Sequence, residues 1–304
     1  IARLVGSEMC IRDRFIVVSI FLSFSALSAT NSKIRVVTSF TILEDLVSEL
    51  GGRYVDVKNL VARNSDAHMY IPVPSDLVAV VNADLVIFNG LGFEGWIDRL
   101  LNESSGSVKH LDASRGVRTL ESSGEVDPHA WQSFDNIRIY INNISETLIS
   151  MMPENKQYFI DRKMIYLNRL DDLNKKLSFE LSKIPISHRI VVTSHDAFAY
   201  LGREFQIEFL APLGLSLDVE ASAEDIAYVI DQIRERNVRA LFIENINNPK
   251  LLQMISLESD IAVGGRIYSD ALSEIEGPAS TYLKMMEHNL MSLIEAFDLK
   301  ESEV

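Results

Sequence analysis

The chain has 304 residues, 43 Asp and Glu residues against 29 Lys and Arg residues, and a formal net charge of −14. Such an acidic protein lacks the basic face that binds nucleic acid through counterion release, and it does not suit a polybasic membrane-surface role. Its single cysteine excludes a disulfide framework and any cysteine-rich zinc or iron–sulfur site, and its length predicts more than one domain.

Residues 1–29 have the pattern of a secretory signal peptide. Two arginines precede a short apolar stretch at residues 15–22, and small residues follow it, so that cleavage is expected after Ser28 or Ala29. The stretch is too short and too rich in serine for a membrane anchor. Because Cys10 precedes the apolar stretch, it is not placed like a lipoprotein cysteine. We therefore expect a soluble periplasmic protein and, as its quaternary state, a monomer.

Short β-rich runs alternate with helical sequence in two separate regions of the mature chain. In both regions the alternation predicts parallel βαβ units. The runs expected to form strands are residues 34–40, 54–61 and 83–90, and then 189–194, 239–245 and 261–267. The fold class is therefore α/β, with two similar βα lobes that contain parallel sheets. We expect an N-terminal lobe at 30–152, a connecting segment at 153–187 and a C-terminal lobe at 188–304.

The connecting segment is predicted to be one long helix from Glu154 to Ile184, since it contains no glycine and no internal proline. Thirty-one residues at ~1.5 Å each give a rigid rod of roughly 45 Å. Apolar residues spaced by three or four define its buried face. The residues expected on that face are Met164, Leu167, Leu170, Leu173, Leu177, Leu181 and Ile184.

Two motifs resemble enzyme signatures without the required context. The GLGFEG run at residues 90–95 matches a dinucleotide-binding pattern, with Asp112 as a candidate ribose ligand, but it follows the third expected strand rather than the first. The sequence Ser194-His195-Asp196 is no hydrolase triad, because triad side chains converge from separate positions in the chain. We expect the glycines to shape a turn and the serine to have no nucleophilic role.

Three of the six histidines share a setting, in polar loops that follow strands or open helices. His68, His129 and His195 lie in such loops, and Asp270 follows the expected strand at 261–267 in the same way. Loops at the carboxyl ends of parallel strands are the usual ligand sites of α/β lobes. Three imidazoles and one carboxylate form a set suited to Zn²⁺ or another first-row divalent ion. We expect the other histidines to lie on the surface; they are His110, His188 and His288.

The segments that contain these residues resemble those of the zinc- and manganese-binding solute-binding proteins of ABC importers. The resemblance covers residues 33–297 and rests on five segments: DAHMYIPVPSD, NGLGFEGW, DPHAWQS, TSHDAFAYLGREF and IYSDALS. It implies two lobes joined by a long rigid helix, with one metal site in the interlobe cleft. It also implies a membrane permease as partner, and as metal ligands His68, His129, His195 and Asp270.

The resemblance favours zinc as the transported ion and leaves manganese or iron as alternatives. Manganese-specialised relatives often have a glutamate in place of His195, and imidazole suits zinc. Many zinc-specialised relatives, however, have a long His- and acid-rich loop where residues 102–126 form a short, loop-like stretch with one histidine, His110. Four carboxylates are candidates to orient the imidazoles: Asp66, Asp127, Asp196 and Glu244.

Two other classes compete with a transport receptor. A secreted zinc hydrolase would need an open position for water, whereas four protein ligands fill a tetrahedral site, and the chain has no H-E-x-x-H motif. An adhesion or interaction protein could use the same ion structurally, but a structural ion would exchange slowly. We therefore expect a binding protein and not an enzyme.

Overall fold

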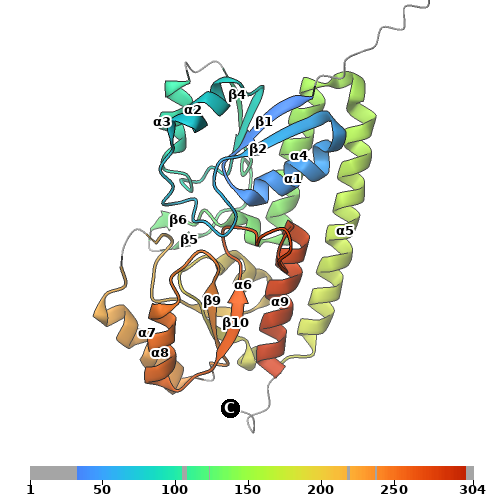
Figure 1. Ribbon diagram of the computed structural model, residues 1–304. Coiled ribbons are helices and arrows are strands. Elements are labelled where there is room, and N and C mark those ends of the chain that lie inside the picture. Colours follow the sequence, from blue (N-terminus) through green and yellow to red (C-terminus); the bar gives the residue numbers. More distant parts are fainter. Residues whose placement is uncertain (1–32, 105–107, 123, 218–219, 237, 299–304) are drawn as a thin grey trace, which may run out of the picture. The chain divides into compact units, whose positions relative to one another are not determined.

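A computed structural model describes residues 33–104, 108–122, 124–217, 220–236 and 238–298. The signal peptide predicted at residues 1–29 lies outside this part of the chain. Strands and helices alternate through it, as Figure 1 shows, and most strands belong to one of two parallel four-stranded sheets. The α/β class and the two sheets expected from the sequence are therefore confirmed.

The first sheet has the order β2-β1-β3-β4. Its strands are β1 (Ile34–Thr38), β2 (Val55–Asn59), β3 (Leu85–Phe88) and β4 (Lys109–Asp112). The central strand β1 pairs in parallel with β2 on one side and with β3 on the other. Apolar side chains of β1 are buried on both faces of the sheet, which is typical of a parallel strand covered by helices.

The second sheet repeats this arrangement with the order β10-β9-β7-β8. Its strands are β7 (Ile190–Val192), β8 (Glu208–Leu210), β9 (Leu241–Glu244) and β10 (Val263–Ile267). In each sheet the first strand has the second strand on one side and the third on the other. This reversal creates a switch point, at which the loops after neighbouring strands separate and leave room for a ligand.

Nine α-helices in the described residues surround the sheets. They are α1 (Thr41–Gly51), α2 (Pro74–Val81), α3 (Ile97–Glu103), α4 (Phe134–Met151), α5 (Lys156–Ser182), α6 (Ala199–Phe205), α7 (Ala223–Glu235), α8 (Lys250–Ser259) and α9 (Tyr282–Asp298). Within the described residues, no helix combines the length and the apolar character needed to cross a membrane.

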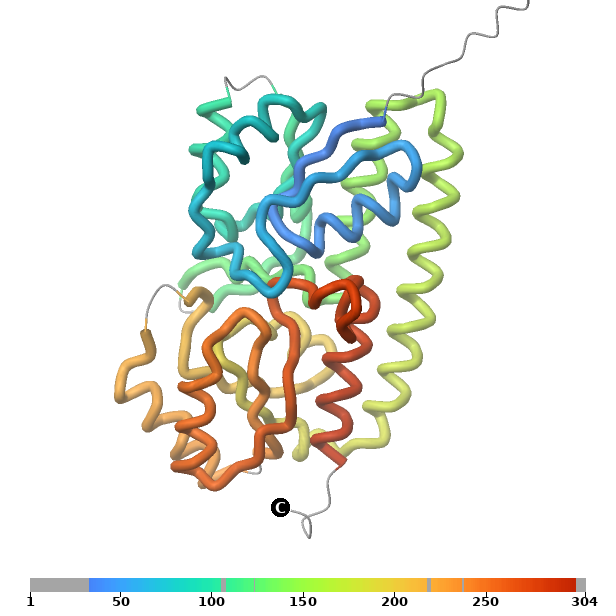
Figure 2. Tube along the Cα trace, in the orientation of Figure 1, coloured from blue at the N-terminus to red at the C-terminus, as the bar shows by residue number. Residues whose placement is uncertain are grey.

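Helix α5 is the long connecting helix expected from the sequence, and it has 27 residues. It begins after Pro153 and ends before Pro185, and the Arg189 guanidinium donates hydrogen bonds to the carbonyls of Leu181 and Ile184 at its C-terminal end. Helix α5 contacts α1 and α4 as well as α9, so it joins the two halves of the fold. Figure 2 shows the yellow-green α5 passing both the blue α1 and the red α9.

The buried stripe of α5 differs from the predicted one at its N-terminal half. Leu170, Leu177 and Leu181 are buried as expected, but Met164 is 51% exposed. The side chains of Phe159 and Tyr166 are buried instead. Successive buried residues of α5 are alternately seven and four positions apart. The buried stripe therefore turns slowly around the helix axis.

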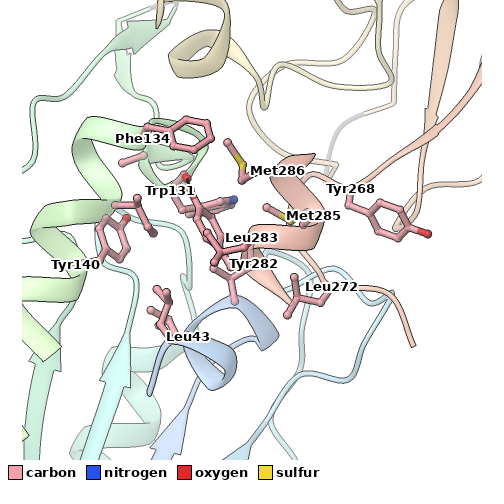
Figure 3. Packing of buried hydrophobic residues seen from close by; sticks show 14 of the residues in the cluster. Leu43, Trp131, Phe134, Tyr140, Tyr268, Leu272, Tyr282, Leu283, Met285 and Met286 are labelled. Carbon is pink, nitrogen blue, oxygen red and sulfur yellow. Dashed lines mark hydrogen bonds between the residues drawn. The ribbon is translucent and has the colours of Figure 1, made fainter. Parts of the chain in front are cut away.

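One continuous apolar cluster extends from the first sheet through α4 and α5 to α9. Figure 3 shows Trp131 and Phe134, just before and at the start of α4, beside Tyr282, Leu283 and Met286 of α9. The Tyr282 hydroxyl donates a hydrogen bond to the Trp131 carbonyl at 2.8 Å. The two sheets are therefore linked by packed side chains as well as by the helix.

The loop expected at residues 102–126 contains regular structure that the sequence did not predict. Strand β4 is an edge strand of the first sheet, and β5 (Glu121–Ser122) pairs with β6 (Glu125–Val126) in a short hairpin. Strand β8, at the edge of the second sheet, was also missed. Edge strands of this kind are short and partly exposed, so they lack the apolar run by which a central strand is recognised.

Candidate metal centre

His68 lies in the loop between β2 and α2, and local hydrogen bonds fix that loop. The carboxylate of Asp66 accepts the backbone N–H of His68 at 2.7 Å, which forms a turn directly before the imidazole. The Trp96 indole N–H donates to the carbonyl of Ala67 at 2.8 Å. Because Trp96 belongs to the NGLGFEGW segment, this contact ties the His68 loop to the loop that follows β3.

His129 is fully buried at the start of a short 3-10 turn, and Asp127 fixes the orientation of its ring. One oxygen of Asp127 accepts the backbone N–H of His129 at 2.9 Å and lies 2.8 Å from its Nδ1. A carboxylate at Nδ1 holds the proton there, so that Nε2 keeps a lone pair for a metal ion.

His195 follows β7 at the switch point of the second sheet, and Glu244 at the end of β9 has the corresponding role. One oxygen of Glu244 accepts the backbone N–H groups of Ser194 and His195 at 2.8 and 3.0 Å. Its other oxygen lies 2.6 Å from Nδ1 of His195. The Nε2 atom of His195 therefore faces Asp270, whose Oδ2 is 3.4 Å away.

Asp270 comes from the loop after β10, and side chains of the N-terminal half of the chain hold this loop. The Thr41 hydroxyl accepts the backbone N–H of Leu272 at 2.8 Å, and the N–H of Asn64 donates to the Leu272 carbonyl at 3.1 Å. On the other side of Asp270, the Trp131 indole N–H donates to the Ser269 carbonyl at 2.9 Å. The carboxylate that follows a strand of the second sheet is thus positioned by contacts with the first half of the chain.

The structure brings all four predicted ligands together, since one candidate ligand atom from each lies within 4.8 Å of the others. The Nε2 atoms of His68 and His129 are 3.3 Å apart, and the Asp270 oxygens lie 3.7 Å from Nε2 of His129 and 3.9 Å from Nε2 of His68. Ligands at ~2.0–2.1 Å from a tetrahedral zinc ion are roughly 3.3 Å from one another. The observed spacing therefore suits a first-row divalent ion.

Burial and charge within the cluster act in opposite directions on the pKa values. Burial alone would lower the pKa of His195, but the carboxylates of Glu244 and Asp270 outweigh it and raise that pKa well above its usual value. Burial would raise the pKa of Asp270, but the three imidazoles, His195 most strongly, lower it far below its usual value. Asp270 is therefore ionised at neutral pH and in contact with a protonated His195. Neither of its oxygens has a well-formed hydrogen bond among the described residues.

Three of the four carboxylates proposed to orient the imidazoles contact the ligand residues. Asp127 and Glu244 contact imidazole nitrogens, whereas Asp66 accepts the backbone N–H of His68. Burial and the nearby charge of Asp270 raise the pKa of Asp66 to about 6. The expectation for Asp196 was wrong, because its carboxylate accepts a hydrogen bond from the Ser122 hydroxyl at 2.8 Å, on the β5–β6 hairpin.

The NGLGFEGW segment packs against the metal-ligand cluster. It does not form a nucleotide-binding motif. Phe93 packs edge-on against the His68 ring, with 4.3 Å between the ring centroids. The buried carboxylate of Glu94 accepts hydrogen bonds from the Ser39 hydroxyl at 2.6 Å and the Asn89 backbone N–H at 2.7 Å, and burial raises its pKa to about 7. Gly90 has a φ of +86°, and a Cβ there would lie 2.4 Å from the Asp112 carboxylate.

The remaining histidines lie away from the cluster. His110 is exposed on the edge strand β4, as expected, and His188 is half-buried in the turn before β7. His288 is also half-buried, with Nε2 2.9 Å from the Arg266 carbonyl, so it is only partly exposed at the surface. Thr41 and Trp131 hold the Asp270 loop, as does Gln132, whose side-chain amide donates to the Ser269 carbonyl at 2.8 Å. These residues were not identified from the sequence, because no spacing pattern connects them with Asp270.

Comparison with known proteins agrees with this architecture. The family model described as "Zinc-uptake complex component A periplasmic" matches residues 36–296. The manganese-binding lipoprotein MntA of Halalkalibacterium halodurans is 30% identical over 262 residues, which cover 86% of this chain and 87% of that protein. The iron-binding protein YfeA of Yersinia pestis is 30% identical over 275 residues, or 89% of this chain and 88% of that protein.

Solved structures show the same fold. The periplasmic zinc-binding protein TroA of Treponema pallidum superposes with a TM-score of 0.84 at 27% identity, over 88% of this chain and 99% of TroA. A manganese-bound periplasmic metal-binding protein from Candidatus Liberibacter asiaticus gives a TM-score of 0.80 at 27% identity, over 87% of this chain and 100% of that chain.

Two parallel sheets, a long helix that links the two lobes and a cluster of side chains able to ligate a metal define a metal-binding solute receptor. The chain belongs to the zinc-uptake component A family, the metal-binding periplasmic solute-binding proteins of ABC importers. Proteins of this family are the substrate-binding components of transporters, and the resemblance inferred from the five sequence segments is confirmed.

Proposed function

We propose that the protein captures one divalent transition-metal ion between His68, His129, His195 and Asp270 and delivers it to a membrane permease of the ABC type. The observation that carries this proposal is the convergence of the four side chains within 4.8 Å. Asp127 and Glu244 contact Nδ1 of two of the imidazoles, which leaves Nε2 of each to bind the ion. A set of ligands oriented in this way needs little rearrangement to coordinate a metal.

Zinc is the ion that we propose first, because imidazole nitrogen suits zinc better than it suits manganese. Manganese and iron are the alternatives, and the names of relatives support them. The two 30% identical relatives are named as manganese- and iron-binding proteins, whereas TroA is named as a zinc-binding protein. Because these relatives differ in the ion after which they are named, their names do not select one for this chain.

Delivery requires that the ion be released again, and the arrangement of the lobes suggests how. We propose lobes at residues 30–152 and 188–304, joined by the segment 153–187, so that an ion bound by ligands from both lobes favours the closed cleft. The helix α5 would restrict the closing motion, because it packs along both halves of the fold. Contact with the permease would then need to shift only a few ligands to release the ion.

We further propose that the protein works in the periplasm as a soluble monomer, after removal of a signal peptide at residues 1–29. Several relatives, including MntA, are named as lipoproteins. In this chain Cys10 precedes the apolar stretch, which is not the position of a lipoprotein cysteine. Fractionation of cells that express the full chain, with and without globomycin to block lipoprotein processing, tests this point.

Calorimetric titration of the chelator-stripped protein with Zn²⁺ and with Mn²⁺ at neutral pH tests the proposed function. One reversible zinc site, with much weaker manganese binding, is the expected result. Comparable affinity for manganese would indicate that the protein transports manganese, or both ions, rather than zinc alone. A protein that binds neither ion, nor Fe²⁺ under anaerobic conditions, would refute the proposed metal receptor.

A further inference from the structure

A pocket of about 340 Å³ lies directly beside the metal-ligand cluster. Both halves of the chain line it, through the loops after β2 and β3 and the strand β6 with the residues after it on one side, and through the loop after β8 on the other. The residues that line it are His68, Leu91, Gly92, Glu125, Val126, Pro128, Leu215 and Ser216. One metal ligand, His68, therefore also forms part of the wall of an open pocket.

His68 differs in burial from the other three ligands. Its side chain is 8% exposed, whereas the side chains of His129, His195 and Asp270 are 0% exposed. His68 is therefore the ligand of the four whose side chain is in contact with solvent in the described structure.

Glu125 lines this pocket from β6, the second strand of the β5–β6 hairpin. Its side chain is exposed, and it is the only carboxylate among the described residues that line the pocket, which include no lysine or arginine. An exposed carboxylate in a pocket lining without lysine or arginine attracts a hydrated cation and raises its local concentration. One carboxylate supplies a single ligand where a zinc site takes four, so it binds such an ion weakly enough to pass it on.

We infer that divalent ions enter and leave the cluster through this pocket, with Glu125 as a first capture ligand that transfers the ion to His68. This inference rests on the proposed function and adds the route and the residue that receives the hydrated ion. Glu125 is not one of the four final ligands. Its removal should therefore alter the rate at which ions arrive without altering the geometry of the bound ion.

The two tryptophans of the chain provide a native signal for the rate measurement. Trp131 packs against His129 with 5.3 Å between ring centroids, and Trp96 is bonded to the loop that carries His68. Stopped-flow fluorescence of the chelator-stripped full protein, mixed with Zn²⁺ at low ionic strength, should follow association. Competition with a chelator should follow dissociation.

The first comparison is between E125Q and E121Q. Both substitutions remove one negative charge from the same hairpin, and both glutamates are exposed, but Glu121 does not line the pocket. We expect E125Q to slow zinc association by about three- to tenfold at low salt, with a smaller effect at 1 M salt, where the Debye length is about 3 Å. E121Q should change the rate less than twofold. Equal effects of the two substitutions would show that only net charge matters and would overturn the inference.

The second comparison tests the route by narrowing it. V126W places an indole in the pocket wall, and V263W makes the same substitution on β10, away from the pocket; Val126 and Val263 are 40% and 41% exposed. V126W should slow association and dissociation together by at least fivefold and leave the dissociation constant within about twofold. Wild-type rates for V126W would overturn the route. Absence of any zinc response in the wild type would instead refute the proposed function.

Discussion

A histidine coordinates a metal ion well when its other ring nitrogen is held by a fixed partner, and His129 and His195 both meet this condition. Asp127 lies two residues before His129, so its role is visible in the sequence as an acid–x–histidine spacing. Glu244 lies 49 residues after His195, and only the pairing of β7 with β9 brings the two together. Local spacing could predict the first contact, whereas the second depends on the topology of the sheet.

Loss of one imidazole should remove most of the metal affinity. We expect His129→Ala to weaken zinc binding by at least 100-fold, because three ligands and an unpaired Asp127 carboxylate remain in a buried site. His110→Ala, on the exposed strand β4, should leave the affinity unchanged. Calorimetry on both purified variants decides the matter, and a similar affinity for the two would refute the ligand assignment.

Protons and metal ions should compete for the cluster. Because the pKa of His195 is raised by Glu244 and Asp270, His195 holds a proton at neutral pH that zinc must displace. Asp270 has a lowered pKa and needs no deprotonation. Zinc affinity should therefore rise with pH between pH 5 and 7, with at least one proton released per ion. Titration in buffers of different ionisation enthalpy measures the proton count, and a count of zero would contradict this protonation state.

At the scale of elements, helix α5 shows what a hydrophobic pattern can and cannot predict. The absence of glycine and internal proline, and the prolines at both ends, predicted its existence and its bounds within two residues. The pattern assigned Met164 to the buried face, but apolar character alone does not distinguish a buried methionine from an exposed one. Tyr166 was not assigned to the buried face because tyrosine has a polar hydroxyl, although its aromatic ring packs in the core.

Two alanine substitutions in α5 should show which residues of the helix form its buried face. Leu170 is fully buried, so Leu170→Ala should lower the free energy of unfolding by about 2–4 kcal/mol. Met164→Ala removes a half-exposed side chain and should change it by about 0.5 kcal/mol or less. Urea unfolding of the metal-free proteins measures both values. Comparable losses for the two variants would mean that α5 packs with a different face.

The loop that carries Asp270 is an element whose position the sequence could not predict. Its contacts with Thr41, Asn64 and Trp131 join residues separated by more than 100 positions in the chain. No pattern in a single sequence reports such contacts. They nevertheless decide where the carboxylate lies.

Replacement of Thr41 should disturb Asp270 without touching the metal. Thr41→Val removes the acceptor of the Leu272 N–H and should weaken zinc binding by about tenfold, whereas Thr41→Ser retains the hydroxyl and should restore the affinity. The visible absorption of bound Co²⁺ reports the ligand geometry and should change in Thr41→Val alone. An unchanged spectrum and affinity in that variant would show that the hydroxyl does not position Asp270.

At the scale of the whole molecule, alternation of strands and helices predicted two parallel sheets, because this pattern has few other solutions. The edge strands β4 and β8 and the hairpin of β5 and β6 were missed, since short exposed strands have no apolar signature. The missed hairpin is also the element that contributes Glu125 to the pocket beside His68. The ligands themselves were identified by their loop positions and by resemblance to a family, and the fold then brought them within reach of one ion.

A crystal structure of the zinc-loaded protein, with anomalous data collected on both sides of the zinc absorption edge, is the decisive test of the proposed metal site. We expect one strong anomalous peak per chain, at about 2.0–2.1 Å from Nε2 of His68, His129 and His195 and from one oxygen of Asp270. A peak that lacks any of these four ligands, or that lies elsewhere on the protein, would contradict the proposed site.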